Sequence, residues 1–126
     1  MRKVLVVDDD AAVRELIRAL LESEGYAVDT VEDGALALLH VAADRPDVVV
    51  LDVMMPGLDG HAVLARLREH EDGDALLPVV VLTAAADDAQ AWRAWSGGAS
   101  YFLAKPFDAC ELLRYLDHLF DQALAS

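Results

Sequence analysis

Four short apolar runs in this chain are each followed at once by a side chain that can do chemistry. Two runs end in acids, one in a hydroxyl and one in an ammonium: Asp8 with Asp9, Asp52, Thr83 and Lys105. Carboxylates that share a site repel one another, and their proton affinity rises unless a cation joins them. Oxygen ligands from carboxylates, a backbone carbonyl and water are what Mg²⁺ prefers. If these side chains meet, the pattern predicts a Mg²⁺ site.

Such a site is suited to phosphoryl chemistry. With Mg²⁺ in place, one carboxylate can act as a nucleophile toward phosphorus and form an acyl phosphate, while the metal neutralises charge on the phosphoryl oxygens. A new phosphoryl group needs partners nearby. Thr83 offers a hydrogen-bond donor, and Lys105 offers a point charge.

Each of these residues also has an ordinary structural interpretation. The acids at 8–10 can cap a helix, and for Asp10 capping is the favoured interpretation. Asp52 taken alone is typical of a turn or a cap, Thr83 of a strand and Lys105 of a surface. Their joint placement after different apolar runs favours a shared site.

The apolar runs themselves predict the elements that position the site. Strands are expected at residues 4–7, 26–31, 48–51, 79–82 and 101–104. Helices are expected to begin near residues 11, 35, 61, 87 and 109. Alternating strands and helices with short connections predict an α/β fold with a doubly wound, five-stranded parallel sheet. The carboxyl ends of parallel strands lie on one edge, which would bring the candidate residues together.

Apolar spacing also predicts the side of each helix that faces the sheet. The expected inward residues are Val13, Leu16, Ile17, Leu20 and Leu21; Ala35, Leu38, Leu39 and Ala42; Val63, Leu64 and Leu67; and Leu112, Leu116, Leu119, Phe120 and Ala123. Gly25 is expected to end the first helix in a left-handed conformation, and Asp108 to cap the last. Cys110 is expected to be a semi-buried helix residue without chemistry.

Composition excludes several functional classes. Ten Lys and Arg against 23 Asp and Glu give a net charge of −13, which disfavours binding to nucleic acid and to anionic membranes. A single cysteine allows no intrachain disulfide and favours a reducing, cytoplasmic compartment. The first residues carry too few apolar side chains for a signal peptide, and no apolar run reaches membrane-spanning length, so neither a leader nor a membrane span is expected. The four histidines, His40, His61, His70 and His118, lack metal-ligand spacing.

Four segments, in this order, carry a resemblance to a known family: VLVVDDD, VVLDVMMPGLDG, VVVLTA and LAKPF. They resemble the receiver domain of bacterial two-component response regulators over almost the whole chain. The resemblance implies a flavodoxin-like (βα)5 fold with strand order 2-1-3-4-5, a single domain over residues 1–126 and a cis Lys105–Pro106 bond.

The resemblance also implies roles for individual residues. Asp52 is similar to the phospho-accepting aspartate, and Thr83 and Lys105 to the switch hydroxyl and the phosphate-contacting lysine. Expected Mg²⁺ contacts come from Asp9 directly, from Asp8 through water and from the backbone carbonyl of Met54. The phosphoryl donor would be a phosphohistidine on a sensor kinase or phosphotransfer protein, and many family members also accept it from small acyl phosphates. The domain would signal rather than act as a metabolic enzyme.

The signal is expected to leave through the face formed by the fourth helix, the fifth strand and the last helix, toward a partner or an output domain. Phe102 occupies the family's switch-aromatic position and would report the switch by packing, or would be a plain strand aromatic in one rotamer. Trp92 is expected to point inward. Trp95 and Tyr101 are candidates for the partner face, with a Trp95 ring lying flat on its own domain as the alternative.

Departures from the family pattern shape two further expectations. Met54 and Ala85 cannot orient a hydrolytic water, which predicts slow self-dephosphorylation. The segments GGASYF and ELLRYLDHLF lack the pattern of winged-helix regulators, so their symmetric dimer is not expected here. Two rival hypotheses are a Mg²⁺-dependent phosphatase, which would need an acid where Met54 stands, and a pseudo-receiver that only binds a partner.

Overall fold

The computed structural model describes residues 2–53, 59–69, 77–83, 93–94 and 96–125, and side chains only as far as residue 121. Its strands are β1 (Lys3–Val7), β2 (Ala27–Val31), β3 (Val48–Asp52), β4 (Val79–Thr83) and β5 (Tyr101–Ala104). They form one sheet in the order β2-β1-β3-β4-β5, and every neighbouring pair is parallel. The predicted doubly wound, flavodoxin-like sheet is therefore confirmed.

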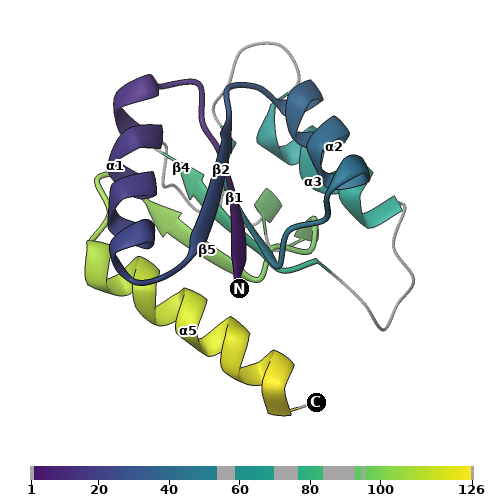
Figure 1. Cartoon of the computed structure of the whole chain (residues 1–126). Helices are drawn as coiled ribbons and strands as arrows, with labels where there is room; N and C mark the ends of the chain where they lie inside the picture. Colours follow the sequence, from purple (N-terminus) through teal and green to yellow (C-terminus); the bar gives the residue numbers. More distant parts are fainter. Residues whose placement is uncertain (1, 54–58, 70–76, 84–92, 95, 126) are drawn as a thin grey trace.

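Helices cover both faces of this sheet (Figure 1). The described helices are α1 (Ala11–Ser23), α2 (Gly34–Ala43), α3 (Gly60–Glu69) and α5 (Ala109–Ala125). Helices α1 and α5 pack on one face, and α2 and α3 on the other. The helix expected near residues 87–96 and the loop at 70–76 lie largely or wholly outside the described residues.

The central strands are buried along their whole length. Every residue of β3 and β4 is buried, as expected for parallel strands with helices on both sides. Side chains alternate between the faces: Val49 and Leu51 join the cluster under α2 and α3, whereas Val48 and Val50 join the cluster under α1 and α5. Asp52 is thus a carboxylate at the end of an otherwise apolar, fully covered strand.

Capping residues begin and end the helices as predicted. The Oδ1 atom of Asp10 accepts hydrogen bonds from the backbone N–H groups of Ala12 at 2.9 Å and Val13 at 3.4 Å. Asp108 does the same for the N–H of Cys110 at 2.8 Å. Gly25 follows α1 with a φ of 90°, a conformation that glycine adopts without steric cost. These caps orient both helices that border the site.

The predicted inward face of α2 was wrong for three of its four residues, whereas Leu38 is partly buried and packs against the cluster under α2 and α3, as expected. Leu39 is 67% exposed, and Ala35 and Ala42 are also exposed. The buried residues are Gly34 and Ala37. Almost every residue of this helix is apolar, so spacing alone cannot select the face that meets the sheet.

Two further burial predictions also need correction. Leu16 is 63% exposed, whereas Ile17 and Leu21 are buried on α1. Successive residues point about 100° apart around a helix, so burial of Ile17 turns Leu16 toward the edge of the stripe. Cys110 is exposed rather than semi-buried. The other inward predictions hold for α3 and for α5 through Phe120, and the side chain of Ala123 is outside the described residues.

Within the described residues, no helix is both long and apolar enough to cross a membrane.

Candidate functional site

The carboxylates of Asp8, Asp9 and Asp52 meet at the carboxyl edge of the sheet. Each offers an oxygen, and these oxygens all lie within 4.8 Å of one another. Asp8 follows β1 and Asp52 ends β3, and these two strands are direct neighbours. Asp8 is completely buried and Asp52 is 2% exposed, whereas Asp9 is exposed. The predicted convergence is confirmed, and an all-oxygen donor set fits a hard cation such as Mg²⁺.

Lys105 brings a positive charge to the two buried acids. Its Nζ atom lies 2.7 Å from Oδ2 of Asp8 and 3.4 Å from Oδ2 of Asp52. Burial acts to lower the pKa of Lys105, but its hydrogen bond to Asp8 and the charges of Asp52 and Asp8 outweigh this effect and raise the pKa. Lys105 is therefore a charged partner of the site and not an ordinary surface lysine.

Asp8 is held by its backbone as well as its side chain. Its N–H donates to the carbonyl oxygen of Val31 at 3.3 Å, and its Oδ1 accepts from the N–H of Asp10 at 2.9 Å. The Nη1 atom of Arg14 donates to the carbonyl oxygen of Asp8 at 2.7 Å. Sequence reasoning missed Arg14, since neither periodicity nor motif spacing marks a contact from a helix side chain to a strand carbonyl.

Gly60 sets the space behind Asp52. A Cβ atom on Gly60 would lie 2.4 Å from the carbonyl oxygen of Asp52 and 2.4 Å from Cα of Val53. The N–H of Gly60 donates to the carbonyl oxygen of Val53 at 3.3 Å. Only glycine allows α3 to begin this close to the end of β3. Nothing in the sequence pattern signals this contact.

Thr83 and Phe102 lie on the two strands beyond β3. Thr83 ends β4 one residue past Leu82, the register partner of Asp52, and is completely buried. Phe102 is half-buried on β5 and packs against the cluster under α2 and α3. The predicted contacts and roles of Met54, Ala85, Trp92 and Trp95 fall outside the described residues.

Tyr101 packs closely on α5. Its ring stacks on Tyr115 with centroids 4.2 Å apart and planes 4° apart, and its hydroxyl hydrogen-bonds to Nδ1 of His118. The Tyr115 hydroxyl donates to Oε1 of Glu111 at 2.7 Å, and this bond raises the pKa of Tyr115. Tyr101 therefore belongs to an aromatic cluster that joins β5 to α5.

An apolar groove of about 500 Å³ adjoins Lys105. Its lining comes from α1 and from the segment between β5 and α5: Val13, Leu16, Leu20, Lys105, Pro106, Phe107 and Ala109. The Lys105–Pro106 peptide bond is cis, as the resemblance implied. The exposed Leu16 side chain thus lies in a groove that contacts the site.

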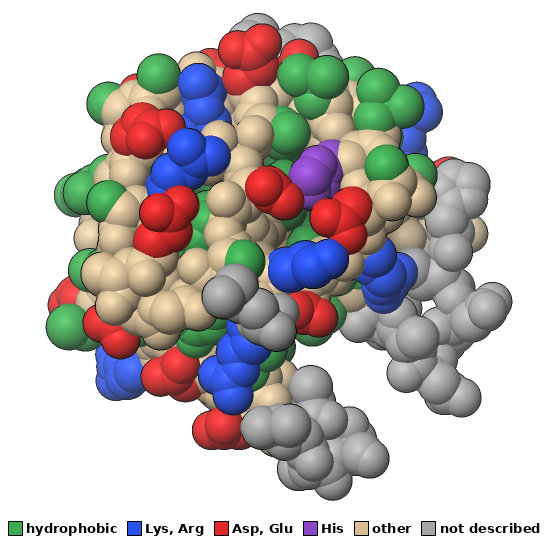
Figure 2. Space-filling view, viewed as in Figure 1, with side chains coloured by type: hydrophobic (Ala, Val, Ile, Leu, Met, Phe, Trp, Pro, Cys, Tyr) green, Lys and Arg blue, Asp and Glu red, His purple; other side chains and the backbone are tan. Residues whose placement is uncertain are grey.

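A second group of possible metal ligands lies away from the site. Asp29, His40 and Asp44 place donor atoms within 4.8 Å of one another, and Figure 2 shows a histidine between acidic side chains on the face in view. Pairwise contacts of an ordinary kind account for this grouping. Lys3 lies 2.7 Å from Asp44, and His40 lies 3.3 Å from Asp29. The hydrogen bond between Lys3 and Asp44 raises the pKa of the lysine and lowers that of the acid.

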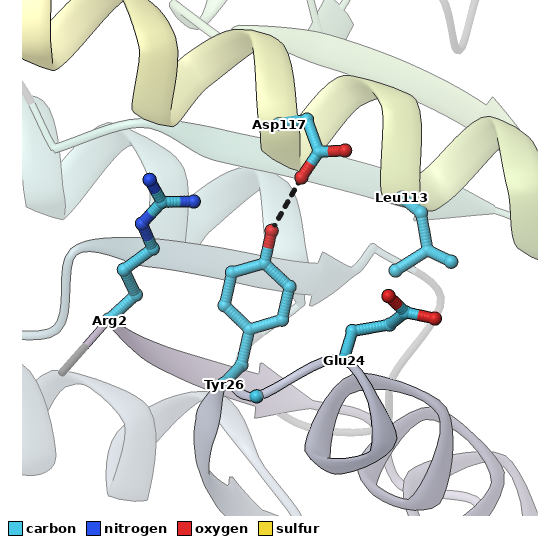
Figure 3. Close-up of a pocket in the computed structure, with 6 residues that line it drawn as sticks. Arg2, Glu24, Tyr26, Leu113 and Asp117 are labelled. Atoms are coloured by element: carbon cyan, nitrogen blue, oxygen red, sulfur yellow. Dashed lines mark hydrogen bonds between the residues drawn. The ribbon is translucent and has the colours of Figure 1, made fainter.

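An open pocket of about 550 Å³ lies between the C-terminal end of α1, the start of β2 and α5 (Figure 3). Its lining is Arg2, Glu24, Gly25, Tyr26, Leu113 and Asp117. The Tyr26 hydroxyl donates to Oδ1 of Asp117 at 2.9 Å, and its ring stacks on Phe120 with centroids 5.5 Å apart. Burial, followed by the interaction with Asp117, raises the pKa of Tyr26 to about 12. These contacts attach α5 to the amino edge of the sheet, opposite the carboxylates.

The fold and the acidic site together define a flavodoxin-like signalling domain. The chain belongs to the response regulator receiver domain family, whose sequence pattern matches residues 4–117. It is 49% identical over 111 residues to the response regulator MprA of Mycolicibacterium vanbaalenii, and 48% identical to that of Mycobacterium avium. Both alignments cover 88% of this chain and 47% of the relative, so the chain spans about half the length of these relatives.

Solved structures give the same family. The receiver domain of the Francisella response regulator 1452 superposes with a TM-score of 0.90 at 32% identity, covering 98% of this chain and 99% of that one. The chemotaxis protein CheY4 of Vibrio cholerae gives a TM-score of 0.87 at 32% identity, with coverage of 94% and 98%. The fold and family expected from the sequence are thereby confirmed.

Proposed function

We propose that this domain accepts a phosphoryl group on Asp52 from a phosphohistidine of a sensor kinase or phosphotransfer protein. The observation that carries this proposal is the meeting of three carboxylates with one ammonium, at 2.7 Å and 3.4 Å from the two buried acids. Residues 1–126 then act as one receiver domain in the cytoplasm. Its output is a change of surface read by a partner or an output domain, not turnover of a metabolite.

The donor set assigns the residues that would hold Mg²⁺. In this proposal Asp9 and Asp52 supply oxygens directly and Asp8 contributes through water, which the grouping of these three acids supports. The backbone carbonyl of Met54, a residue outside the described ones, is the further ligand that the resemblance implies. When bound, Mg²⁺ neutralises charge on the phosphoryl oxygens. Asp8 has both carboxylate oxygens in hydrogen bonds, to Lys105 and to the N–H of Asp10, which supports an indirect role for this acid.

The transfer step follows from the chemistry of the carboxylate. An oxygen of Asp52 attacks phosphorus, the new P–O bond forms as the P–N bond breaks, and the electron pair remains on the imidazole nitrogen of the donor. From acetyl phosphate, the P–O bond to the acyl group breaks and acetate leaves. Lys105 then offers its charge, and Thr83 its hydroxyl, to the new phosphoryl oxygens. This product carries roughly two negative charges at a buried site.

The switch is proposed to run from Thr83 to Phe102. A Thr83 hydroxyl drawn toward the phosphoryl group vacates space beside β5, and Phe102 responds by repacking. The readout surface includes Tyr101 on β5, with Trp95 as a further candidate. The phosphoryl group is expected to persist, because Met54 and Ala85 offer no group that could orient a hydrolytic water.

The apolar groove beside Lys105 is proposed to receive the phosphoryl donor. It adjoins the acceptor site and presents Leu16, which is 63% exposed, along with Pro106 and Phe107. A helix that carries a phosphohistidine can bury apolar side chains in this groove while the phosphoryl group reaches the carboxylates. Because the groove is apolar, affinity for the donor would depend on burial more than on charge.

Incubation with acetyl phosphate, with and without Mg²⁺, tests the acceptor role directly. Intact mass should show one added phosphoryl group that requires Mg²⁺ and is lost in Asp52→Asn, which keeps the size of the side chain. Where acetyl phosphate gives no adduct, a phosphorylated histidine donor is the second arm. Absence of an adduct with both donors would leave a partner-binding pseudo-receiver, and turnover of a phosphoester would indicate a phosphatase.

A further inference from the structure

The backbone hydrogen bonds between β1 and β2 continue to Asp8, one residue past the end of β1. The last residue of β2, Val31, still accepts from the N–H of Asp8 at 3.3 Å. In a parallel ladder, the carbonyl of Asp8 should next accept from an N–H two residues further along the neighbouring strand. That residue is Asp33, whose backbone instead begins α2 as its N-cap.

Arg14 supplies the missing donor. Its Nη1 atom donates to the carbonyl oxygen of Asp8 at 2.7 Å, from the first turn of α1. The bond is partly buried, so water competes with it less than at the surface. The guanidinium therefore takes the place of a strand residue and extends the ordered part of β1 to Asp8.

This bond lies directly behind the acidic site. Asp8 is completely buried and contacts Lys105 and the N–H of Asp10 through its carboxylate, and the exposed Asp9 follows it in the chain. A backbone free to move at Asp8 would displace all of these groups. We infer that Arg14 is a positioning residue, whose hydrogen bond to the Asp8 carbonyl holds the Asp8–Asp9 segment in the geometry that binds Mg²⁺. This inference rests on the proposed function.

A charge effect and a positioning effect predict opposite results at this residue. If the guanidinium acted only as a positive charge near the acids, removing it would strengthen binding of a divalent cation. If it positions the carboxylates, removing it weakens binding. Loss of a partner that orients metal ligands commonly costs 10-fold or more in affinity, so Arg14→Met should bind Mg²⁺ about tenfold more weakly.

Arg18 provides a matched control on the same helix. It lies one turn further along α1, donates to Oγ1 of Thr30 at 3.3 Å and pairs with Glu15 and Glu22. Arg18→Met removes the same charge and a contact to β2, but makes no change at Asp8. Arg14→Lys is the conservative variant, because a lysine can return one donor to the carbonyl.

Two measurements on the full chain test whether Arg14 positions the Asp8–Asp9 segment. The first is the dissociation constant of Mg²⁺ for the wild type, Arg14→Met, Arg14→Lys and Arg18→Met, each checked for folding by circular dichroism. The second is amide hydrogen exchange at Asp8 and Asp10 in metal-free protein, where Arg14→Met should exchange faster and Arg18→Met should match the wild type.

The inference is overturned if Arg14→Met binds Mg²⁺ as tightly as Arg18→Met, or if exchange at Asp10 is unchanged. It also fails if Arg14→Lys comes no closer to the wild type than Arg14→Met does. The exchange measurement needs neither metal nor phosphoryl transfer. A wild type that accepts no phosphoryl group would therefore refute the proposed function while the exchange comparison still decides whether Arg14 orders this segment.

Discussion

The ammonium of Lys105 lies closer to Asp8 than to Asp52, at 2.7 Å from one carboxylate and 3.4 Å from the other. One lysine thus contacts two buried acids, one directly after β1 and one at the end of β3. A divalent cation bound to the same carboxylates would meet this ammonium at short range. If the proposed function holds, Lys105 would oppose Mg²⁺ binding in the free protein, and its charge would stabilise a phosphoryl group on Asp52.

Replacing Lys105 with methionine should separate these two effects. Lys105→Met is expected to bind Mg²⁺ roughly 30-fold more tightly, because a unit charge about 4 Å from a divalent ion opposes it by roughly 2 kcal/mol even in water. The same variant should accumulate less phosphorylated protein from acetyl phosphate. Titration with Mg²⁺ and intact mass check the two results. Weaker Mg²⁺ binding would show that Lys105 orders the acids more than it repels the cation.

Leu16→Ser tests the groove as the docking site of the phosphoryl donor. Leu16 is 63% exposed, so the change should alter the free energy of unfolding by no more than about 0.5 kcal/mol. Transfer from a phosphorylated histidine protein that serves the wild type should slow by about tenfold or more. Phosphorylation by acetyl phosphate should not change.

Leu39→Ser is the matched control for this experiment. Leu39 is 67% exposed but lies on α2, on the other face of the sheet. It should leave transfer from both donors unchanged. Equal slowing by Leu16→Ser and Leu39→Ser, or no slowing by either, would argue against docking in the groove.

Gly60→Ala should destabilise the domain strongly. The added Cβ would lie 2.4 Å from the carbonyl oxygen of Asp52 and from Cα of Val53, and backbone atoms cannot move aside cheaply. A loss of about 2–4 kcal/mol in the free energy of unfolding is expected from urea denaturation.

Gly25→Ala gives the comparison for Gly60. At Gly25 an added Cβ meets nothing within 4 Å, but φ is +90°, so the cost is backbone strain alone, about 1 kcal/mol. The expected order is therefore a larger loss at residue 60 than at residue 25. The reverse order would mean that α3 shifts away from Asp52 and relieves the contact.

Tyr26→Phe should change the dependence of stability on alkaline pH. Burial and the interaction with Asp117 raise the pKa of Tyr26 to about 12, so the folded state favours the neutral phenol. A raised pKa gives stability that is complete below the unfolded value near pH 10 and is lost as pH rises toward about 12. In this range of pH the free energy of unfolding should therefore fall more steeply for the wild type than for Tyr26→Phe.

Two readings check the Tyr26 prediction. In an ultraviolet titration of tyrosinate formation, the transition with the highest pKa should be absent from Tyr26→Phe. At pH 8 the variant should be less stable by about 1 kcal/mol, the usual value of one hydrogen bond. Contributions from Lys105, whose pKa is also raised, are common to both proteins and cancel in the comparison. Identical slopes for the two proteins would contradict the prediction.

Much of the fold was predictable because its strands carry an unusually direct signal. Val48–Leu51 and Val79–Leu82 are continuous apolar runs that end in polar side chains, and the structure places both at the centre of the sheet. The meeting of Asp8 with Asp52 then follows from parallel topology alone. Motif order along the chain added the strand order and the family, which periodicity could not supply.

Other features depend on contacts that no local pattern encodes. The inward face of α2 was misassigned because the helix is apolar on most sides, and Leu16 is exposed because the buried stripe of α1 centres on Ile17. Arg14 and Gly60 were not recognised as neighbours of the site. Both act on backbone carbonyls of residues on other elements, and sequence spacing carries no record of such contacts.

Helix α5 connects the two edges of the sheet. Its first turn, capped by Asp108, follows closely after Lys105, and about two turns later Asp117 accepts the hydrogen bond from Tyr26 at the opposite edge. Its 17 residues correspond to roughly 25 Å of rigid rod. If the first turn of α5 tilted beside the carboxylates, the helix would rotate about the hydrogen bond between Tyr26 and Asp117. A change at the carboxyl edge would then displace the outer surface of α5.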